Sequence, residues 1–409
     1  MTTNTENVCV PTAKVQVAWL ILLLLVLFGV DWTARFAVFR WHDGLVRRAS
    51  APLSTRGPEA PMQRIEIPAV RGGDLTRLVG FPSFAERFAE EKPATVIVTD
   101  EHGYRNDPPT EGITFPVVVT GDSFFHVQYG PDGSFPKQLA SVLDMPLYNH
   151  AYPGRGMFWG MIRFLSDPRF ADRRPKVVVW GCLERDISGQ AFAGFVHQVW
   201  QLEQPEMAAQ ERVARGQVGV AWNRLVPASL RSSLPDSSWL GAYATRFWNR
   251  ARFAVFGQVT EDVVVSLPDA KGGQELFYRI ALQAMAWPRD IREPEKVGWG
   301  AAYIRRYLQS LGMDLVVVLI PDKESVFRER IPSGPGRDPS AWPPSTLLDV
   351  EDALRAEGVT VVNLLPAFRE QAERGVPLYW RDDTHWRPEA MALAAELTAP
   401  VVRARMVAP

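Results

Sequence analysis

Five short, continuous apolar runs constrain the fold of this 409-residue chain more than any other feature. They alternate with stretches of helical periodicity along the chain. Strands that are covered by helices on both faces have this pattern. The sequence therefore predicts a doubly wound α/β domain with a five-stranded parallel sheet, whose ligand lies at the carboxyl ends of the strands. The five runs are Val117–Thr120, Leu147–Asn149, Val177–Trp180, Leu315–Ile320 and Val359–Asn363.

The segments around these runs predict how the chain is organised. Residues 187–297, between the third and fourth runs, are far longer than one crossover needs. Their amphipathic stretches predict an inserted, mostly helical cap over the ligand edge of the sheet. Residues 35–94 are rich in Pro, Gly, Arg and Ala and predict a juxtamembrane connector. We therefore expect the catalytic domain to span residues 95–405.

An uncharged apolar run, Val15 to Val30, follows a polar tail at residues 1–14. Because a helix needs about 20 residues to cross a bilayer, we expect a single transmembrane anchor over residues 15–34. A cleaved signal peptide and a buried core helix are the alternatives, although no small-x-small cleavage site follows the run. Four arginines follow the run, which by the positive-inside rule predicts a cytoplasmic C-terminal domain, but long domains translocate despite such flanks.

The composition excludes several classes of function. A net charge of −1 argues against nucleic-acid binding by a general basic surface. The two cysteines, Cys9 and Cys182, exclude a disulfide framework and a cysteine-based zinc site. His42, His102 and His197 have no acidic or histidine partners at ligand spacing, so we expect no metal and no cofactor.

The first run ends on the motif Gly121-Asp122-Ser123. Ser123 falls where a strand gives way to a helix, and the free N–H groups of a helix start can stabilise an oxyanion. This position favours a nucleophilic serine. The alternative is a helix N-cap, because Asp and Ser both cap helices well.

Near the C-terminus, two carboxylates and an imidazole precede a helix that begins with Pro388. An aspartate two or three positions before His385 can accept the imidazole N–H and leave the other ring nitrogen facing the serine. Asp382 and Asp383 both qualify by spacing. The sequence therefore predicts a Ser/His/Asp triad for acyl transfer.

Further residues at the expected ligand edge are candidates for binding substrate. Arg185 follows the third run and Lys323 the fourth, and each either contacts substrate or forms ion pairs within the protein. Trp386, beside His385, either stacks against sugar rings or packs in the core.

These motifs resemble those of the SGNH (GDSL-like) hydrolases, in the same chain order. The segment Asn149 to Gly154 is similar to the Asn-x-Gly-x-x-Gly block of that superfamily, with Ala151 in place of the first glycine. The segment after the third run takes the place of the Gly-x-Asn-Asp block, but Leu183 stands where the oxyanion-hole asparagine is expected. Loss of such a donor lowers the rate by roughly 10²–10³.

Within the superfamily, the chain most resembles the alginate O-acetyltransferases and related exopolysaccharide acetylation proteins. The resemblance rests chiefly on Asp383-Thr384-His385-Trp386, although this element precedes the serine motif in the alginate proteins and follows it here. It implies a triad of Ser123, His385 and Asp383, and a periplasmic catalytic domain on an inner-membrane anchor. It also implies a polysaccharide acceptor and a membrane-bound O-acyltransferase that supplies acetyl groups.

The function expected from these observations is O-acetylation of a cell-envelope or secreted polysaccharide. Ser123 would attack the acetyl donor, with its own N–H and that of Gly154 holding the oxyanion, and Asn149 is a further candidate for binding the oxyanion or the substrate. A carbohydrate O-acetyl esterase would use the same residues with water as the acceptor. A non-catalytic glycan-binding scaffold of an export complex is the second alternative.

Overall fold

The computed structural model describes residues 57–131, 133–205, 239–257, 262–269, 272–332 and 345–407, with 15, 17–27, 29, 207 and 259 besides. These residues divide into two compact units, one within residues 1–50 and 215–248, the other within 51–214 and 249–409. Each unit is described by itself.

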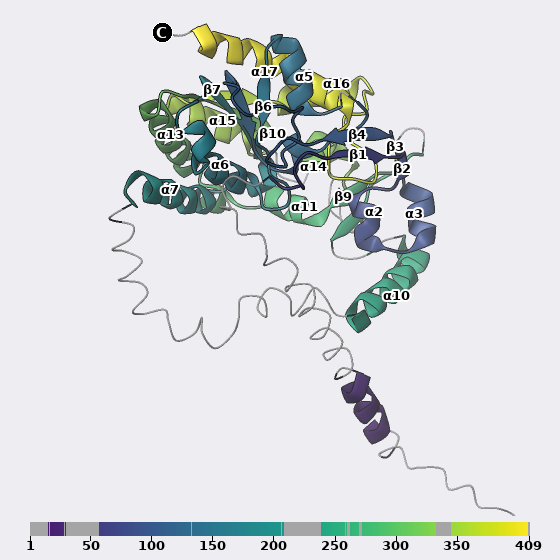
Figure 1. Ribbon diagram of the computed structural model, residues 1–409. Coiled ribbons are helices and arrows are strands. Elements are labelled where there is room, and N and C mark those ends of the chain that lie inside the picture. Colours follow the sequence, from purple (N-terminus) through teal and green to yellow (C-terminus); the bar gives the residue numbers. More distant parts are fainter. Residues whose placement is uncertain are drawn as a thin grey trace, which may run out of the picture. The chain divides into compact units, whose positions relative to one another are not determined.

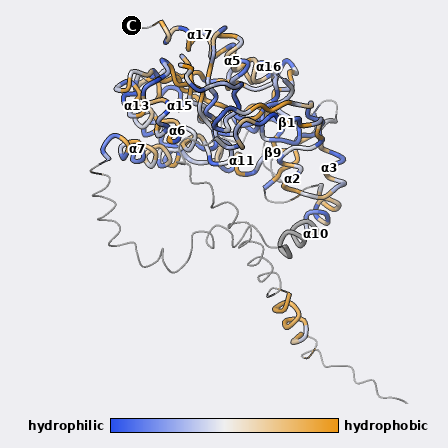
Figure 2. The backbone as a smooth tube through the Cα atoms, in the orientation of Figure 1, coloured by the Kyte–Doolittle hydropathy of each residue, from blue (hydrophilic) through white to orange (hydrophobic). Residues whose placement is uncertain are grey.

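The described residues near the N-terminus are helical and strongly hydrophobic (Figure 2). Among the residues that the structure describes, no helix is both long enough and apolar enough to cross a membrane. The tail 1–14 and the end of the expected anchor, residues 30–34, lie outside the described residues. The anchor over 15–34 therefore stays a prediction.

The second unit contains the predicted five-stranded parallel sheet (Figure 1). Its strands are β5 (Val117–Thr120), β6 (Leu147–Asn149), β7 (Val177–Leu183), β10 (Asp314–Ile320) and β11 (Thr360–Asn363), in the order β11-β10-β7-β5-β6. Every residue of β5 and β7 is buried. The prediction of an α/β fold with a five-stranded parallel sheet is thus confirmed.

Helices cover both faces of this sheet, as a doubly wound fold requires. One layer contains α5 and α17, which contact each other, and the other contains α6, α7, α13 and α15 (Figure 1). Their bounds are α5 Phe135–Leu143, α6 Met157–Leu165, α7 Gly189–Glu203, α13 Pro294–Ser310, α15 Leu347–Ala356 and α17 Pro388–Val407. Four further helices directly follow sheet strands: α4 Ser123–His126, η2 Glu184–Asp186, α14 Lys323–Val326 and α16 Leu365–Glu373. Two short 3-10 helices lie elsewhere, η1 Pro168–Phe170 between α6 and β7 and η3 Arg328–Arg330 after α14.

The long segment between β7 and β10 is an insertion, as predicted, but it is not only helical. Besides α7 it contains α10 (Trp239–Phe256), α11 (Arg279–Met285) and α12 (Arg289–Arg292). Strands β8 (Val263–Val265) and β9 (Leu276–Tyr278) form an antiparallel hairpin within it. β-branched and aromatic residues favour such strands. Most of residues 206–238 lie outside the described part of the chain.

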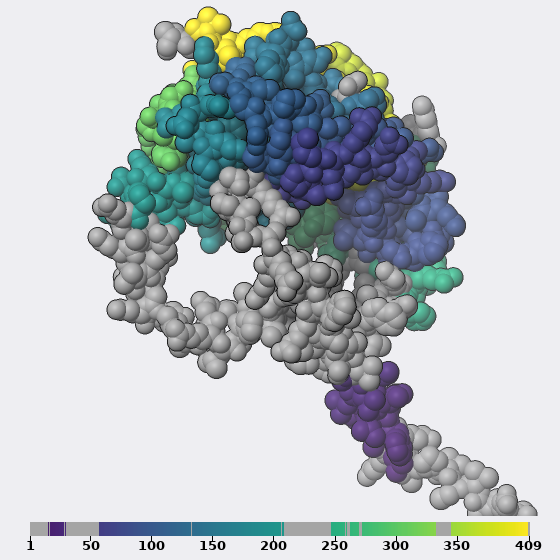
Figure 3. Space-filling model, viewed as in Figure 1, coloured from purple at the N-terminus to yellow at the C-terminus, as the bar shows by residue number. Residues whose placement is uncertain are grey.

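Residues 57–94 differ from the expected connector because they fold against the rest of the second unit. Strand β1 (Arg64–Ile67) pairs with β4 (Thr95–Val98), and β2 (Val70–Arg71) pairs with β3 (Glu91–Lys92). Helices α2 (Asp74–Val79) and α3 (Pro82–Phe88) lie between β2 and β3 in the chain. The space-filling view shows this segment on the outside of the unit in purple and blue (Figure 3).

A separate small core explains why residues 57–94 are ordered. Apolar side chains of α2 and α3 pack with β8 and β9 of the insertion, and Phe253 of α10 lies 5.1 Å from Phe84, ring centre to ring centre. The buried members of this cluster are Leu75, Val79, Phe81, Phe84, Phe88, Val259, Val263, Val265 and Leu276. The insertion and the N-terminal segment thus stabilise each other.

Candidate active site

Ser123 is presented by the tight turn after β5. Asp122 caps α4, since its carboxylate accepts the N–H of Phe124 at 2.9 Å. Helix α6 packs so closely on this turn that a Cβ on Gly160 would lie 2.3 Å from the carbonyl oxygen of Gly121. Strand, cap and glycine contact together fix the position of Ser123 at the carboxyl end of the sheet.

The structure brings Ser123, His385 and Asp383 together although 262 residues separate the serine from the histidine. His385 Nε2 lies 2.9 Å from Ser123 Oγ, and His385 Nδ1 lies 2.7 Å from Asp383 Oδ1. The backbone N–H of His385 also donates to Asp383 Oδ1, at 3.0 Å. This chain of hydrogen bonds joins a hydroxyl, a base and the acid that orients the base, which is the arrangement of a triad.

The structure places Asp383, and not Asp382, against the imidazole. Asp382 is fully buried and forms an ion pair with Lys92. Its Oδ2 accepts the N–H of Glu90 at 3.0 Å, and its carbonyl oxygen accepts the N–H of Leu75 at 3.2 Å. The carboxylate of Asp382 is therefore turned towards residues 57–94 and away from His385.

The electrostatics of the pair favour a charged histidine. Burial disfavours the imidazolium, but the hydrogen bond and the charge of Asp383 outweigh it and raise the pKa of His385 above its ordinary value. Burial likewise opposes ionisation of Asp383, yet the hydrogen bond from His385 holds the pKa of this carboxyl well below its usual range. The ionised form of Asp383 is thus favoured, and its negative charge stabilises the positive charge that His385 gains as a base.

The family to which this site belongs follows from comparison with known proteins. Residues 44–184 and 291–408, more than half of the chain, match the family model described as the SGNH hydrolase-like domain of the acetyltransferase AlgX. The chain belongs to this family. The match leaves out residues 185–290, most of which form the insertion between β7 and β10.

Solved structures similar to this AlgX-family chain include SGNH hydrolases and an acetyltransferase. A candidate SGNH hydrolase from Slackia heliotrinireducens is 11% identical over 71% of this chain and 99% of its own, with a TM-score of 0.34. The O-acetyltransferase domain of Pseudomonas putida AlgJ is 21% identical over 38% of this chain and 48% of its own, with a TM-score of 0.20. These scores are low, so the assignment rests on the family match. Among curated proteins, none matches the chain.

In this member of the AlgX family, the triad opens into a pocket of about 440 Å³. Its walls come from α2, from the segment after β7 and from strand β9, so the N-terminal segment and the insertion both contribute. The lining residues are Asp74, Leu75, Arg77, Leu78, Ser123, Arg185, Tyr278, Thr384 and His385.

Arg185 is the predicted binding residue that the structure places beside the triad. Its guanidinium donates to Asp322 Oδ1 and lies 5.6 Å from the ring centres of both Phe124 and Tyr278. Burial opposes its charge, but Asp322 outweighs this and raises the pKa of Arg185 above its ordinary value. A fixed cation therefore lines the pocket that contains Ser123.

Asn149 and Gly154, the candidates from the oxyanion blocks, are not among the described residues that line this pocket. Asn149 is buried, with its Oδ1 accepting the N–H of Ala151 at 3.0 Å and its Nδ2 donating to the carbonyl of Phe125 at 3.5 Å. Gly154 has a φ of +79° in the loop that leads from β6 to α6. Leu183 is buried at the end of β7 and offers no polar side-chain atom.

Lys323 and Trp386 occupy different positions from those expected of substrate-binding residues. Lys323 is 1% exposed, and its ammonium donates to the carbonyl oxygens of Leu276, Trp380 and Arg381 at 3.0, 2.7 and 3.0 Å. All three of its N–H donors are thus used within the protein. Trp386 is fully buried, and its indole N–H donates to the carbonyl of Phe124 at 2.9 Å. Both residues therefore stabilise the segments that present the triad, by hydrogen bonds to the backbone of Trp380, Arg381 and Phe124.

The sequence predicts Ser123, Arg185 and His385 as site residues, and Thr384 enters only as part of a motif. The lining residues that sequence reasoning missed are Asp74, Leu75, Arg77, Leu78 and Tyr278. Asp74 and Tyr278 come from the expected connector and the expected cap, where no motif points to the triad. The proximity of these segments to His385 depends on tertiary packing. The sequence signal available for Asp74 is its place after Gly72-Gly73, a pattern common at helix starts.

Among the described residues, one group could hold a metal ion by the spacing of its ligand atoms, which all lie within 4.8 Å of one another. It consists of Asp74, Asp383 and His385. Two ligand atoms of a tetrahedral zinc ion, each about 2.0 Å from it, are roughly 3.2 Å apart. The separation of 2.7 Å between His385 Nδ1 and Asp383 Oδ1 is shorter than this and is that of a hydrogen bond. The geometry therefore favours a triad over a metal centre.

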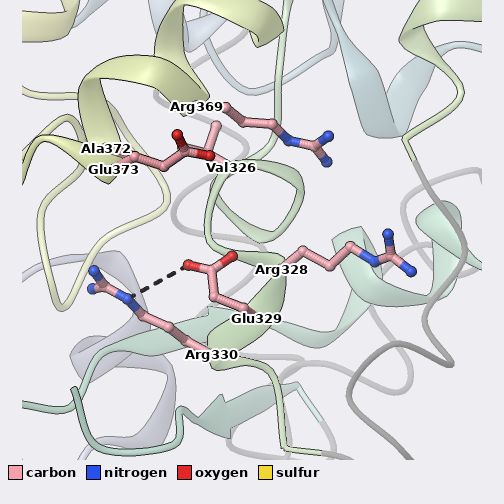
Figure 4. Close-up of a pocket in the computed structure, with 7 residues that line it drawn as sticks. All are labelled: Val326, Arg328, Glu329, Arg330, Arg369, Ala372 and Glu373. Carbon is pink, nitrogen blue, oxygen red and sulfur yellow. Dashed lines mark ion pairs between the residues drawn. The ribbon is translucent and has the colours of Figure 1, made fainter. Parts of the chain in front are cut away.

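A second cavity, of about 640 Å³, lies between η3 and α16 (Figure 4). Its arginines make contacts within the protein. Arg330 forms ion pairs with Glu275 and Glu329, and Arg369 donates to the carbonyl of Ser325 at 2.8 Å. Neither Ser123 nor His385 lines this cavity, so it is separate from the pocket of the triad.

Proposed function

We propose that this protein is an O-acetyltransferase that moves acetyl groups, through an acetyl-serine, to hydroxyls of a cell-envelope or secreted polysaccharide. The observation that carries the proposal is the hydrogen-bond chain from Ser123 through His385 to Asp383 in a chain of the AlgX acetyltransferase family.

The first half of the reaction would acetylate Ser123. His385 Nε2 accepts the hydroxyl proton while Oγ attacks the carbonyl carbon of an acetyl ester. The tetrahedral intermediate collapses, and the bond to the leaving alcohol breaks as that alcohol takes the proton from His385. Asp383 holds the imidazole in the required orientation and stabilises its transient positive charge.

The second half would transfer the acetyl group. A sugar hydroxyl gives its proton to His385 as its oxygen attacks the acetyl carbon. The bond to Ser123 Oγ then breaks, and the serine recovers a proton from His385. Water in place of the sugar gives an esterase, which is the second candidate function, and a scaffold that only binds glycan is the third.

Arg185 would supply the positive charge that stabilises the oxyanion, together with the N–H of Ser123. Removal of one oxyanion-hole donor from an enzyme costs roughly 10²–10³ in rate, and Leu183 provides no side-chain donor here. Arg185 lines the same pocket as Ser123 and carries a charge held by Asp322. The N–H of Gly154 remains a further candidate donor.

The expected partners and location belong to the same proposal. The acceptor would be a polysaccharide, and a membrane-bound O-acyltransferase would supply the acetyl groups. An anchor at residues 15–34 would hold the catalytic domain on the extracytoplasmic side of the inner membrane.

Mass spectrometry of the full-length protein after incubation with an activated acetyl ester tests the proposal. We expect one added acetyl group on the wild type and none on Ser123→Ala. Ser141→Ala, which removes an exposed serine from α5, is the matched control and should behave as wild type. When an oligosaccharide acceptor is added to the same incubation, acetylated oligosaccharide identifies a transferase, and release of acetate alone identifies an esterase. An adduct that survives in Ser123→Ala would refute the assignment of the nucleophile.

A further inference from the structure

The triad carboxylate is held from both of its oxygens. Asp383 Oδ1 accepts from His385, while Asp383 Oδ2 accepts the backbone N–H of Asp74 at 3.2 Å. Asp74 is the first residue of α2, and therefore comes from the N-terminal segment and not from the parallel sheet.

The side chain of Asp74 is also directed at the catalytic loop. Its Oδ1 accepts the N–H of Thr384 at 2.8 Å, and its Oδ2 accepts the Thr384 hydroxyl. The same Oδ2 lies 3.7 Å from His385 Nδ1. The side chain is 37% exposed and lines the pocket with Ser123. A second carboxylate thus lies beside the imidazole on the side opposite the serine.

We propose that Asp74 is a positioning residue of this site, a second carboxylate that stabilises the imidazolium form of His385 and fixes Asp383 during acyl transfer. The proposal rests on the function proposed above. The site would then contain two carboxylates. Asp383 is in direct contact with the base, and Asp74 acts on the base by its charge. The N-terminal segment would then complete the active site.

Other charges around His385 act in both directions. Burial lowers the pKa of His385, Asp383 and then Asp74 raise it, and Arg185 lowers it. The groups of neighbouring elements that interact with His385 electrostatically are Asp383 from its own loop, Asp74 from α2, Arg185 from η2, and Asp122 and His126 at α4. Burial and then the charge of Asp383 raise the pKa of Asp74 itself above its ordinary value, whereas His385 and the hydrogen bonds from Thr384 act to lower it. Substitution of Asp74 by an uncharged residue isolates its contribution at His385.

The test is Asp74→Asn, which keeps the size of the side chain and removes its charge. Since kcat/KM requires the neutral imidazole, activity falls as the pH drops through the pKa of His385. Without the carboxylate we expect this acid limb to move to lower pH by roughly one unit. Thr384→Val is the matched control, because it removes the hydroxyl bound to Asp74 and leaves the charge in place. Its acid limb should stay where it is in the wild type.

A readout that needs no activity separates this proposal from the proposed function. The pKa of His385 is measured by NMR titration of its ring protons in the Ser123→Ala protein, with and without Asp74→Asn. A downward shift supports Asp74 even if no acetyl transfer is ever detected. An unchanged pKa of His385 would overturn it and leave Asp74 as a residue that only holds the loop of Thr384. If Asp74→Asn does not fold, Asp74→Ser removes the same charge and is measured in the same way.

Discussion

The buried ion pair between Lys92 and Asp382 tests whether contacts between residues 57–94 and the loop of Asp382 stabilise the folded protein. Lys92 is 7% and Asp382 0% exposed, and the ammonium also lies 5.1 Å from the ring centre of Trp380. Lys92→Met keeps most of the apolar stem and leaves the carboxylate of Asp382 with one N–H donor, that of Glu90. Removal of one partner from a buried pair typically destabilises a protein by about 3–5 kcal/mol.

We therefore expect Lys92→Met to lower the free energy of unfolding by about 3–5 kcal/mol, measured by urea denaturation. The double variant Lys92→Met/Asp382→Asn should recover a large part of this loss, because no uncompensated charge remains buried. Lys296→Met, which breaks an exposed pair with Glu293, is the matched control and should change stability by less than about 1 kcal/mol. Equal losses in the single and double variants would refute the reasoning, because the charge of Asp382 would then not be the cause.

Two further predictions concern the pocket and the turn that presents the nucleophile. Arg185→Met should lower kcat/KM for an acetyl ester by roughly 10²–10³. Arg185→Lys should recover only part of this activity, because an ammonium lacks the planar fork of a guanidinium. Steady-state assays measure both variants, and a loss below tenfold in Arg185→Met would exclude Arg185 as an oxyanion donor. Gly160→Ala should destabilise the protein by about 1–3 kcal/mol and lower activity, since its Cβ would lie 2.3 Å from the Gly121 carbonyl oxygen. Gly194→Ala on α7 is the control and should leave stability unchanged or raise it, because nothing lies within 4 Å of the added Cβ. Thermal unfolding of both variants measures the difference, and equal losses of stability would contradict the packing argument.

The sheet could be predicted because a strand buried on both faces carries its evidence in its own residues. The runs that begin at Val117 and Val177 are strands β5 and β7, as expected. The expected strand from Val177 to Trp180 is longer in the structure and ends at Leu183. Its extra residues pair with β10, with Gly181 opposite Val318. The cause is tertiary pairing, which the sequence of the strand alone does not contain.

The N-terminal segment could not be predicted because its stability comes from distant residues. Helices α2 and α3 have 6 and 7 residues, too few for a helical period to stand out in windows of about 11–18 residues. They are ordered by contacts with Phe253 and with the strands of the insertion. Spacing alone left the choice between Asp382 and Asp383 open for the same reason, since Lys92, which binds Asp382, lies 290 residues away in the sequence.

The two sides of the pocket come from different parts of the chain, one from the N-terminal segment and one from the insertion between β7 and β10. Backbone N–H groups of Asp74, Leu75 and Glu90 hold the Asp382–Asp383 loop from the N-terminal segment, which lies within the family match. Because catalytic groups must be held to within about 0.5 Å, this segment fixes the geometry of the triad. Tyr278 on the facing side belongs to the insertion, which the family match leaves out. The wall that holds the triad therefore lies inside the family match, whereas Tyr278 lines the pocket from a segment outside it.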